Sequence, residues 1–97
     1  MNIKHFNDGT INKNRVVLNN DGKTLELFFS YETIIGYRFS SATLNKEGFS
    51  KNYFSRTTSR YQNALRPDKH ARIEHNVMMQ ELEVVIFGLI TPSYTTV

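Results

Sequence analysis

Residues 52–66 read NYFSRTTSRYQNALR, and the hydrophobic pattern of the chain changes across this stretch. Before it, apolar residues recur mainly at every second position, which is typical of strands, and after it they recur every three to four positions, which is typical of helices. Hydroxyl and arginine side chains fill its centre, from Ser55 to Arg60. The pattern predicts that a strand ends and a helix begins here, and we call residues 52–66 the junction.

The junction is also the best candidate for a binding site. The first turn of a helix points free backbone N–H groups outward, and together with arginines these groups can hold an anion. Residues 51–72 carry six Lys or Arg and one Asp, a net charge of +5, whereas residues 1–50 carry +1 and residues 73–97 carry −3. Such local basic clusters suit phosphates or an acidic protein surface. The candidate binding residues are Lys51, Tyr53, Arg56, Thr57, Ser59, Arg60 and Arg66.

A purely structural role for the junction is an equally well supported alternative. Ser55 or Thr57 can cap a helix, and the arginines can form a solvated face. Phe54 and Tyr61 also lie where core residues are expected. The sequence leaves both interpretations open.

Before the junction, a hairpin is predicted over residues 15–30. Val16 and Val17 are β-branched and begin its first strand, and residues 23–30 continue with a partly alternating apolar pattern. Between the two strands, Asn-Asn-Asp-Gly at 19–22 supplies residues that tolerate the positive φ of a tight turn.

Residues 33–40 repeat the strand pattern, with Ile35, Tyr37 and Phe39 on one face and the residues between them on the other. The preceding residues, 30–32, include neither Gly nor Pro. They therefore predict either a tight turn or a bulge within one long bent strand, and the sequence does not choose between them.

The two ends of the strand region are predicted from weaker signals. Polar residues at 41–48 predict a loop, and residues 49–55 predict the last strand. Residues 1–13 predict a frayed arm or a short edge strand around Ile3 to Phe6. Because all the connections are short, we expect an antiparallel meander of three to four strands.

A short helix is predicted at residues 57–65. Pro67 disfavours helical geometry at the residue before it, so the helix should end there. The helix should bury Tyr61, Ala64 and Leu65.

A longer amphipathic helix is predicted at residues 71–87, with Asp68 as its cap and Gly88 as the first residue beyond its C-terminus. Its apolar stripe has three-to-four spacing and comprises Ile73, Val77, Met78, Leu82, Val85, Ile86 and Leu89. Such a helix can cover the apolar face of the sheet. The sequence thus predicts one α+β domain over residues 1–97, with residues 91–97 as a mobile tail.

Several functional classes find no support in the sequence. The chain has no cysteine, which excludes disulfides and thiolate metal sites. His70 and His75 are five residues apart, a spacing that does not place two ligands on one helical face. No nucleophile and base motif is present, and no apolar run reaches the ~20 residues of a membrane span. We therefore expect a cytoplasmic protein that is not an enzyme, with no metal, cofactor or membrane partner.

Two pieces of the sequence resemble a family of short uncharacterised proteins from phages, mobile elements and archaea. They are LFFSYETIIGYR at 27–38 and NYFSRTTSRYQN at 52–63, and the resemblance covers about residues 25–65. The family combines a Ser-Tyr-x-Thr strand with a Ser-x-Thr-Thr junction and a helix. Its junction helix often has His where this chain has Tyr61, so any role of that imidazole is absent here. The resemblance implies an origin and no catalytic residues.

These observations give two functional hypotheses. The first is a non-catalytic binding module, encoded by a phage, that inhibits a host defence nucleoprotein such as a CRISPR effector in an anti-CRISPR-like manner. This hypothesis rests on analogy with other small phage proteins. The alternative is direct binding of single-stranded nucleic acid by the same basic and aromatic residues. Two copies could also pair through an uncovered sheet edge to form a homodimer.

Overall fold

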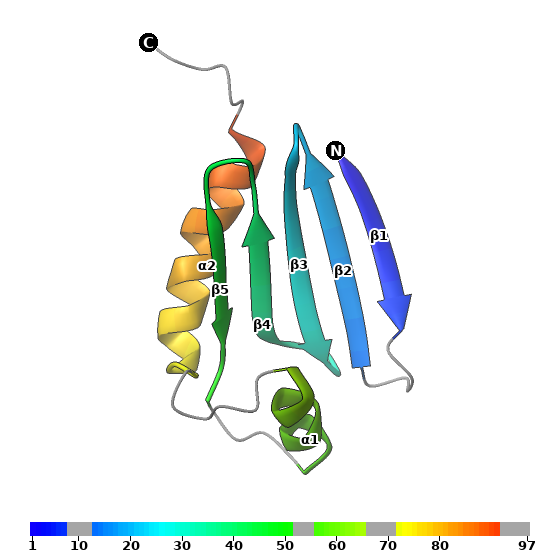
Figure 1. Cartoon of the computed structure of the whole chain (residues 1–97). Helices are drawn as coiled ribbons and strands as arrows, with labels where there is room; N and C mark the ends of the chain where they lie inside the picture. The colour runs from blue at the N-terminus through cyan, green and yellow to red at the C-terminus, as the bar shows by residue number, and fades with distance from the viewer. Residues whose placement is uncertain (8–12, 52–55, 66–71, 92–97) are drawn as a thin grey trace.

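The computed structural model describes residues 1–7, 13–51, 56–65 and 72–91, and for residues 56–59 it describes the backbone alone. Five strands form one antiparallel sheet in the order β1-β2-β3-β4-β5, and two helices follow (Figure 1). The strands are β1 (Asn2–Asn7), β2 (Lys13–Asn20), β3 (Lys23–Ser30), β4 (Thr33–Ser40) and β5 (Asn45–Phe49), and the helices are α1 (Arg56–Leu65) and α2 (His75–Ile90).

The α+β class and the antiparallel meander are confirmed, but the strand count is five instead of three to four. The added strand is β1, which pairs with β2 along its whole length and forms one edge of the sheet. All of its residues are exposed, so its sequence carries little of the apolar alternation that marks a buried strand.

The position of the last strand was predicted wrongly. Residues 45–49 form β5, although residues 41–48 were expected to be a loop. The turn before β5 is closed by a hydrogen bond from the Ser41 N–H to the Leu44 carbonyl at 2.9 Å. Only the last two residues of β5, Gly48 and Phe49, are buried, because β5 is the other edge strand. Its polar sequence reflects exposure rather than irregular backbone.

The predicted β2 and β3 hairpin is confirmed. Asp21 and Gly22 have φ values of 53° and 78°, so both central residues of the turn are left-handed, as a two-residue hairpin of the primed type requires. This turn sets a register in which Val16 pairs with Leu27 and Leu18 pairs with Leu25.

The connection between β3 and β4 contains both features that the sequence left open. Tyr31 adopts φ 57° in a tight turn, and the register shifts between Phe28 and Phe29. Phe28 pairs with Gly36 and Phe29 pairs with Ile34, so Ile35 has no cross-strand partner. An extra residue of this kind reverses which face the following side chains take.

The prediction that Ile35 shares a face with Tyr37 and Phe39 is therefore wrong. Ile34 packs against the cluster that contains Tyr37 and Phe39, whereas Ile35 belongs to a separate buried cluster. Simple alternation could not place these residues correctly, because the bulge lies between them.

Helix α1 agrees with the prediction in position and in part of its buried face, since the partly buried Leu65 packs against the same cluster as Tyr61. Tyr61 is buried as expected, while Ala64 is exposed and Gln62 is buried. The Gln62 Nε2 donates to the Ser50 carbonyl at 2.9 Å, which satisfies a polar group in the interior. The helix begins at Arg56, so Thr57 lies inside the first turn and is not its cap. Ser55, the other candidate cap, lies outside the described residues.

Helix α2 begins and ends later than predicted. Backbone hydrogen bonds join Ile73 to Phe49 and Lys51 at 2.9 and 2.8 Å, so residue 73 is extended and the helix starts only after Glu74. At the other end, Gly88 lies inside the helix rather than beyond it. The Lys23 Nζ donates to the Gly88 and Thr91 carbonyls at 2.9 and 2.6 Å and provides a cation at the helix C-terminus.

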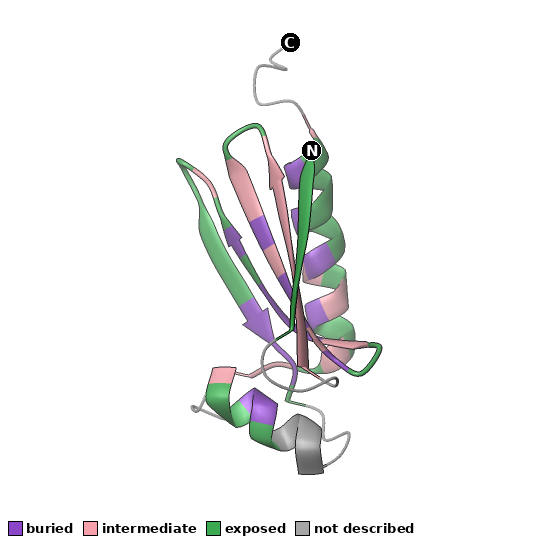
Figure 2. Ribbon diagram, turned by 90° about the vertical axis from the view of Figure 1, so that its right-hand side faces the viewer, coloured by how far each residue is buried: buried purple, intermediate pink, exposed green. Residues whose placement is uncertain are grey.

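The core has two parts on opposite faces of the sheet. On one face, α2 covers β3, β4 and β5 and encloses the larger cluster, which comprises Leu25, Leu27, Tyr37, Phe39, Met78, Leu82, Val85 and Leu89. On the other face, α1 covers a smaller cluster of Phe28, Ile35, Phe49 and Tyr61 at one end of the sheet. Figure 2 shows the two helices on opposite sides, with α1 beyond the end of the strands. Apart from α1 at one end, no helix or strand of the described residues covers the face opposite α2. On α2 itself, Val77 and Ile86 are exposed, although both were predicted to belong to the buried stripe.

Candidate binding surface

The structure places only part of the predicted site. Arg60 is exposed on α1, and the backbone of Arg56, Thr57 and Ser59 lies in the first turns of that helix. Tyr53 and Arg66 fall outside the described residues. The grouping of these side chains around one anion thus stays a prediction.

Lys51 has a partner that the sequence did not suggest. Its Nζ lies 2.6 Å from Oε1 of Glu74, because the backbone pairing of Lys51 with Ile73 brings the two side chains together. Both side chains are at least half exposed, so the pair contributes little to stability. It nonetheless lowers the positive charge that Lys51 offers to a ligand.

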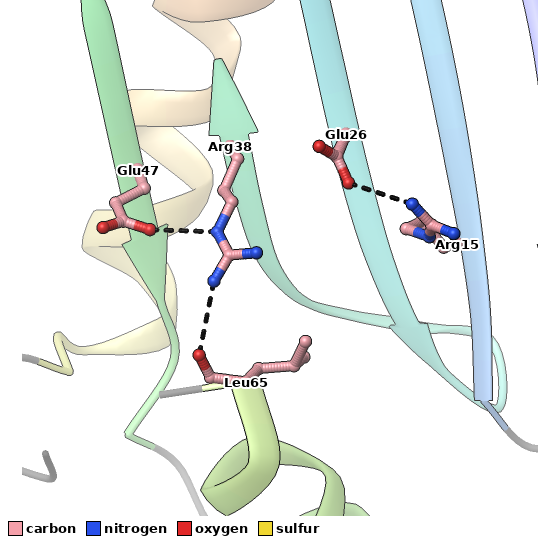
Figure 3. Close-up of polar contacts among 5 residues, drawn as sticks. All are labelled: Arg15, Glu26, Arg38, Glu47 and Leu65. Carbon is pink, nitrogen blue, oxygen red and sulfur yellow. Dashed lines mark hydrogen bonds and ion pairs between the residues drawn. The ribbon is translucent and has the colours of Figure 1, made fainter. Parts of the chain in front are cut away.

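The uncovered face of the sheet carries a row of alternating charges (Figure 3). Arg15 on β2 lies 3.4 Å from Glu26 on β3, and Arg38 on β4 lies 3.1 Å from Glu47 on β5. Glu26, Arg38 and Glu47 are neighbours in the strand register, so each side chain faces an opposite charge across the sheet.

Arg38 connects this row to α1. Its Nη2 donates to the carbonyl of Leu65, the last residue of α1, at 3.4 Å. The guanidinium carbon also lies 5.4 Å from the ring centroids of both Phe28 and Phe49. A planar cation over two buried rings, beside a helix C-terminus, is held in one orientation.

Lys13 and Arg15 lie beside aromatic rings on the same side of the sheet. Lys13 approaches the Tyr61 ring of α1 at 5.7 Å, and Arg15 approaches the Phe6 ring of β1 at 4.6 Å. The structure thus brings strand cations next to the helix that carries the exposed Arg60. We call Lys13, Arg15, Arg38 and Arg60 the basic rim.

Strand cations were absent from the predicted site. The sequence did contain some indication of these cations. The alternation of residues 33–40 predicts that Arg38 lies on the polar face of its strand, and Arg15 is a charged residue of the predicted hairpin. Bringing Lys13 and Arg38 to α1 required the pairing of β2, β3 and β4 and the position of the helix. Neither follows from the hydrophobic pattern of single segments.

A shallow groove of about 300 Å³ lies over β3, β4 and β5, and Glu26, Arg38 and Glu47 of the charged row are among its lining residues. Thr24, Ser40 and Asn45 are among the residues that line it. The Ser40 hydroxyl donates to Asn45 at 3.0 Å, and the Thr24 hydroxyl donates to Asn19 at 2.8 Å. Each of these two hydroxyl groups thus already has an acceptor: Asn45, which also lines the groove, and Asn19, which does not.

Tyr37 is the one group in the described residues with a clearly shifted pKa. Its hydroxyl is buried under α2 and donates to Oε1 of Glu81 at 2.9 Å. Burial, then the hydrogen bond to Glu81, then the charge of that carboxylate raise the pKa of Tyr37 well above its ordinary value. A phenol held neutral in this way supports the core rather than the binding surface.

Within the described ranges, no three His, Asp or Glu side chains gather as metal ligands would. Neither α1 nor α2 has the length and apolarity that a bilayer-spanning segment requires.

A family model, described as a family of unknown function and called DUF8033, matches residues 1–81. The chain belongs to this family. The match extends from β1 into α2 and so includes every cation of the basic rim. No curated protein and no solved structure matches the chain. Membership in DUF8033 agrees with the expected uncharacterised family and assigns no activity.

Proposed function

We propose that this DUF8033 protein is a non-catalytic binding module, encoded by a phage or another mobile element, that inhibits a host defence nucleoprotein of the CRISPR effector type in the host cytoplasm. The observation that supports the proposal is the basic rim. Lys13 and Arg38 contact α1 where it meets the face of the sheet opposite α2, Arg15 lies on that same face, and Arg60 is exposed on α1. A nucleoprotein offers the phosphates or acidic side chains that such a rim can bind.

The ion pairs of the row are compatible with ligand binding. Arg15 and Glu26 are each about 30% exposed, and Arg38 and Glu47 about 40% exposed, so water weakens both pairs. A phosphate or a partner carboxylate can compete for these guanidinium groups, since arginine binds planar anions through two parallel hydrogen bonds. In the absence of such a ligand, Glu26 and Glu47 keep Arg15 and Arg38 extended over the sheet.

The alternative function is direct binding of single-stranded nucleic acid. It is favoured by Phe6, whose ring is 40% exposed on the uncovered sheet face and lies under the Arg15 guanidinium. An exposed ring beside a cation is the combination that stacks a base and neutralises its phosphate.

A plasmid interference assay tests the proposal. Cells with an active CRISPR effector reject a targeted plasmid, and we expect co-expression of this protein to restore transformation for at least one effector type. Arg60→Glu should weaken the interaction with that effector about tenfold, because it reverses a charge at the edge of the interface. Lys46→Glu is the matched control, since Lys46 is an exposed cation near the start of β5, and Figure 1 shows that end of the strand away from α1. Equal effects of the two variants would remove the basic rim from the site.

A titration with labelled single-stranded and duplex DNA and RNA separates the two functions. Direct binding predicts an affinity that falls steeply with salt, since phosphate contacts release counterions. In that case Phe6→Ala should reduce the affinity for single strands by about 1 to 3 kcal/mol. No binding at low salt, combined with inhibition in cells, would leave a protein surface as the target.

A further inference from the structure

The groove over β3, β4 and β5 adjoins the basic rim, because Arg38 belongs to both. Polar side chains line the groove in two rows that follow the strand register. The rows are Glu26, Arg38 and Glu47, and Thr24, Ser40 and Asn45. An anion held by the rim at Arg38 therefore has a polar groove beside it.

These two rows lie on the face of the sheet opposite α2. The residues that alternate with them on β3 and β4 belong to the cluster under α2, and successive strand residues point to opposite faces. Phe39 and Lys46 also line the groove, but they pair with each other in the register, so the Lys46 side chain lies on the α2 side with that of Phe39. The charges that face the groove are thus those of Glu26, Arg38 and Glu47.

The hydrogen bonds around the groove leave it rich in acceptors. The Ser40 hydroxyl donates to Asn45 and the Thr24 hydroxyl donates to Asn19, so each hydroxyl group offers a ligand its oxygen lone pairs. The two carboxylates of the groove accept hydrogen bonds and cannot donate them. Arg38 and the Asn45 amide supply the donors. A ligand that suits this groove brings hydroxyl donors, as a sugar does.

Glu26 has capacity for a further hydrogen bond. Among the residues that the structure describes, its partner is Arg15, whose Nη1 lies 3.4 Å from Oε2, beyond the usual range of about 2.7 to 3.2 Å. Figure 3 shows Glu26 between Arg15 and Arg38, with its other carboxylate oxygen turned away from Arg15. A carboxylate oxygen in this position can accept a charge-assisted bond from a ligand hydroxyl.

The size and charge of the groove suit a sugar that lies next to a phosphate. Its volume of about 300 Å³ is at the lower end of the range for ligand pockets, which suits a single sugar unit. The two carboxylates repel a phosphate placed in the groove itself. We therefore expect the phosphate at the rim, near Lys13, Arg38 and Arg60, and the uncharged sugar in the groove.

We propose that the groove binds a ribose of an RNA strand whose phosphates contact the basic rim, and that Glu26 accepts a hydrogen bond from the 2′-hydroxyl of that ribose. The inference rests on the proposed function, since it names RNA as the part of the nucleoprotein that the rim contacts. Deoxyribose lacks this hydroxyl, so DNA gains no such bond in the same groove. The 2′-hydroxyl is the group by which a protein distinguishes RNA from DNA at a given site.

Fluorescence anisotropy of labelled oligonucleotides, titrated with the full chain at low salt, tests the proposal. The probes share one sequence and are single-stranded RNA, the matching DNA, and 2′-O-methyl RNA, whose sugar keeps the 2′ oxygen but has lost its proton. We expect RNA to bind about tenfold more tightly than either of the other probes, because they lack one hydrogen bond to a charged acceptor.

Glu26→Ala should lower the preference for RNA over DNA to less than about twofold without weakening the binding of DNA, because it removes an acceptor and a negative charge together. A purely electrostatic role of Glu26 would raise both affinities by the same factor and leave their ratio unchanged. Glu83→Ala is the matched control, since Glu83 is an exposed acid of α2, on the other side of the sheet. It should keep the wild-type ratio.

The results separate this inference from the proposed function. Equal binding of RNA and DNA by wild type would overturn the inference and leave the rim as a site for phosphates or acidic side chains. A preference for RNA that persists with the 2′-O-methyl probe or in Glu26→Ala would also overturn it, and would indicate recognition of strand shape. If wild type binds neither nucleic acid, the groove is not an RNA site, and the plasmid interference assay still decides the proposed function.

Discussion

Single residues set the contacts between layers in this protein, and Tyr37 is the clearest case. Its ring is fully buried, and its hydroxyl donates to Glu81 of α2. Tyr37→Phe removes this bond and should lower the free energy of unfolding by about 1 kcal/mol at neutral pH, since Glu81 can regain water. Urea denaturation measures this loss.

The same residue gives a pH dependence. Because the pKa of Tyr37 is raised in the folded state, its contribution is fully present below the ordinary tyrosine pKa of about 10 and is lost as the pH rises above that value. Wild type should therefore lose more stability than Tyr37→Phe between pH 9 and pH 11. Parallel pH profiles of the two proteins would contradict this assignment.

Gly36 is required by the close approach of β4 and Phe49. A Cβ at position 36 would overlap the Phe49 ring, which is buried in the smaller cluster. Gly36→Ala should therefore lower the free energy of unfolding by about 1 to 3 kcal/mol, because the ring must move within a packed site. Thermal and urea unfolding measure the effect. A melting temperature equal to that of wild type would show that Phe49 can move freely.

Among the elements, α2 shows how a local signal can mislead. Gly88 was predicted to end the helix, since Gly is common at that position. The helix continues to Ile90 instead, and its last carbonyls are bonded by Lys23 and Asn20 from the sheet. The tertiary contacts of these side chains decide where the helix ends, and the sequence of the helix itself does not contain them.

This difference can be measured at Gly88. A Cβ there meets no atom within 4 Å, so Gly88→Ala should raise the free energy of unfolding by about 0.5 to 1 kcal/mol through helix propensity. If the helix ended at Gly88 in a left-handed conformation, the same change would destabilise the protein. Chemical denaturation shows whether Gly88→Ala raises or lowers the free energy of unfolding. The comparison with Gly36→Ala separates the effect of steric overlap from the effect of helix propensity.

The strands show where sequence reasoning succeeds and where it stops. The hairpin at β2 and β3 could be predicted because Asp21 and Gly22 take the backbone conformations that their residue types favour. The sheet face on which Ile35 lies could not be predicted, because it depends on a bulge, and the bulge forms through pairing with β3. The edge strands β1 and β5 were also hard to place, since exposure removes their apolar alternation.

For the whole molecule, the charge pattern of the sequence was informative but incomplete. It identified Arg60 near the junction, yet the rim also needs Lys13, Arg15 and Arg38 from strands up to 47 positions earlier in the chain. Lys13 and Arg38 contact α1 from the face of the sheet opposite α2. At this scale, the face opposite α2 is charged where it borders α1, and exposed apolar side chains lie on α2 on the other face.

The contact between Ser50 and Ile73 has a consequence for how the sequence of such a protein can evolve. Backbone bonds on both sides of it hold residues 50 and 73 together, so the chain leaves the sheet and returns to it at the same point. Everything between, α1 included, is an insertion into a scaffold of sheet and α2. Insertions whose ends are fixed in this way tolerate changes in length at small entropic cost. Such an arrangement lets the segment between residues 50 and 73 vary while the scaffold of sheet and α2 stays the same.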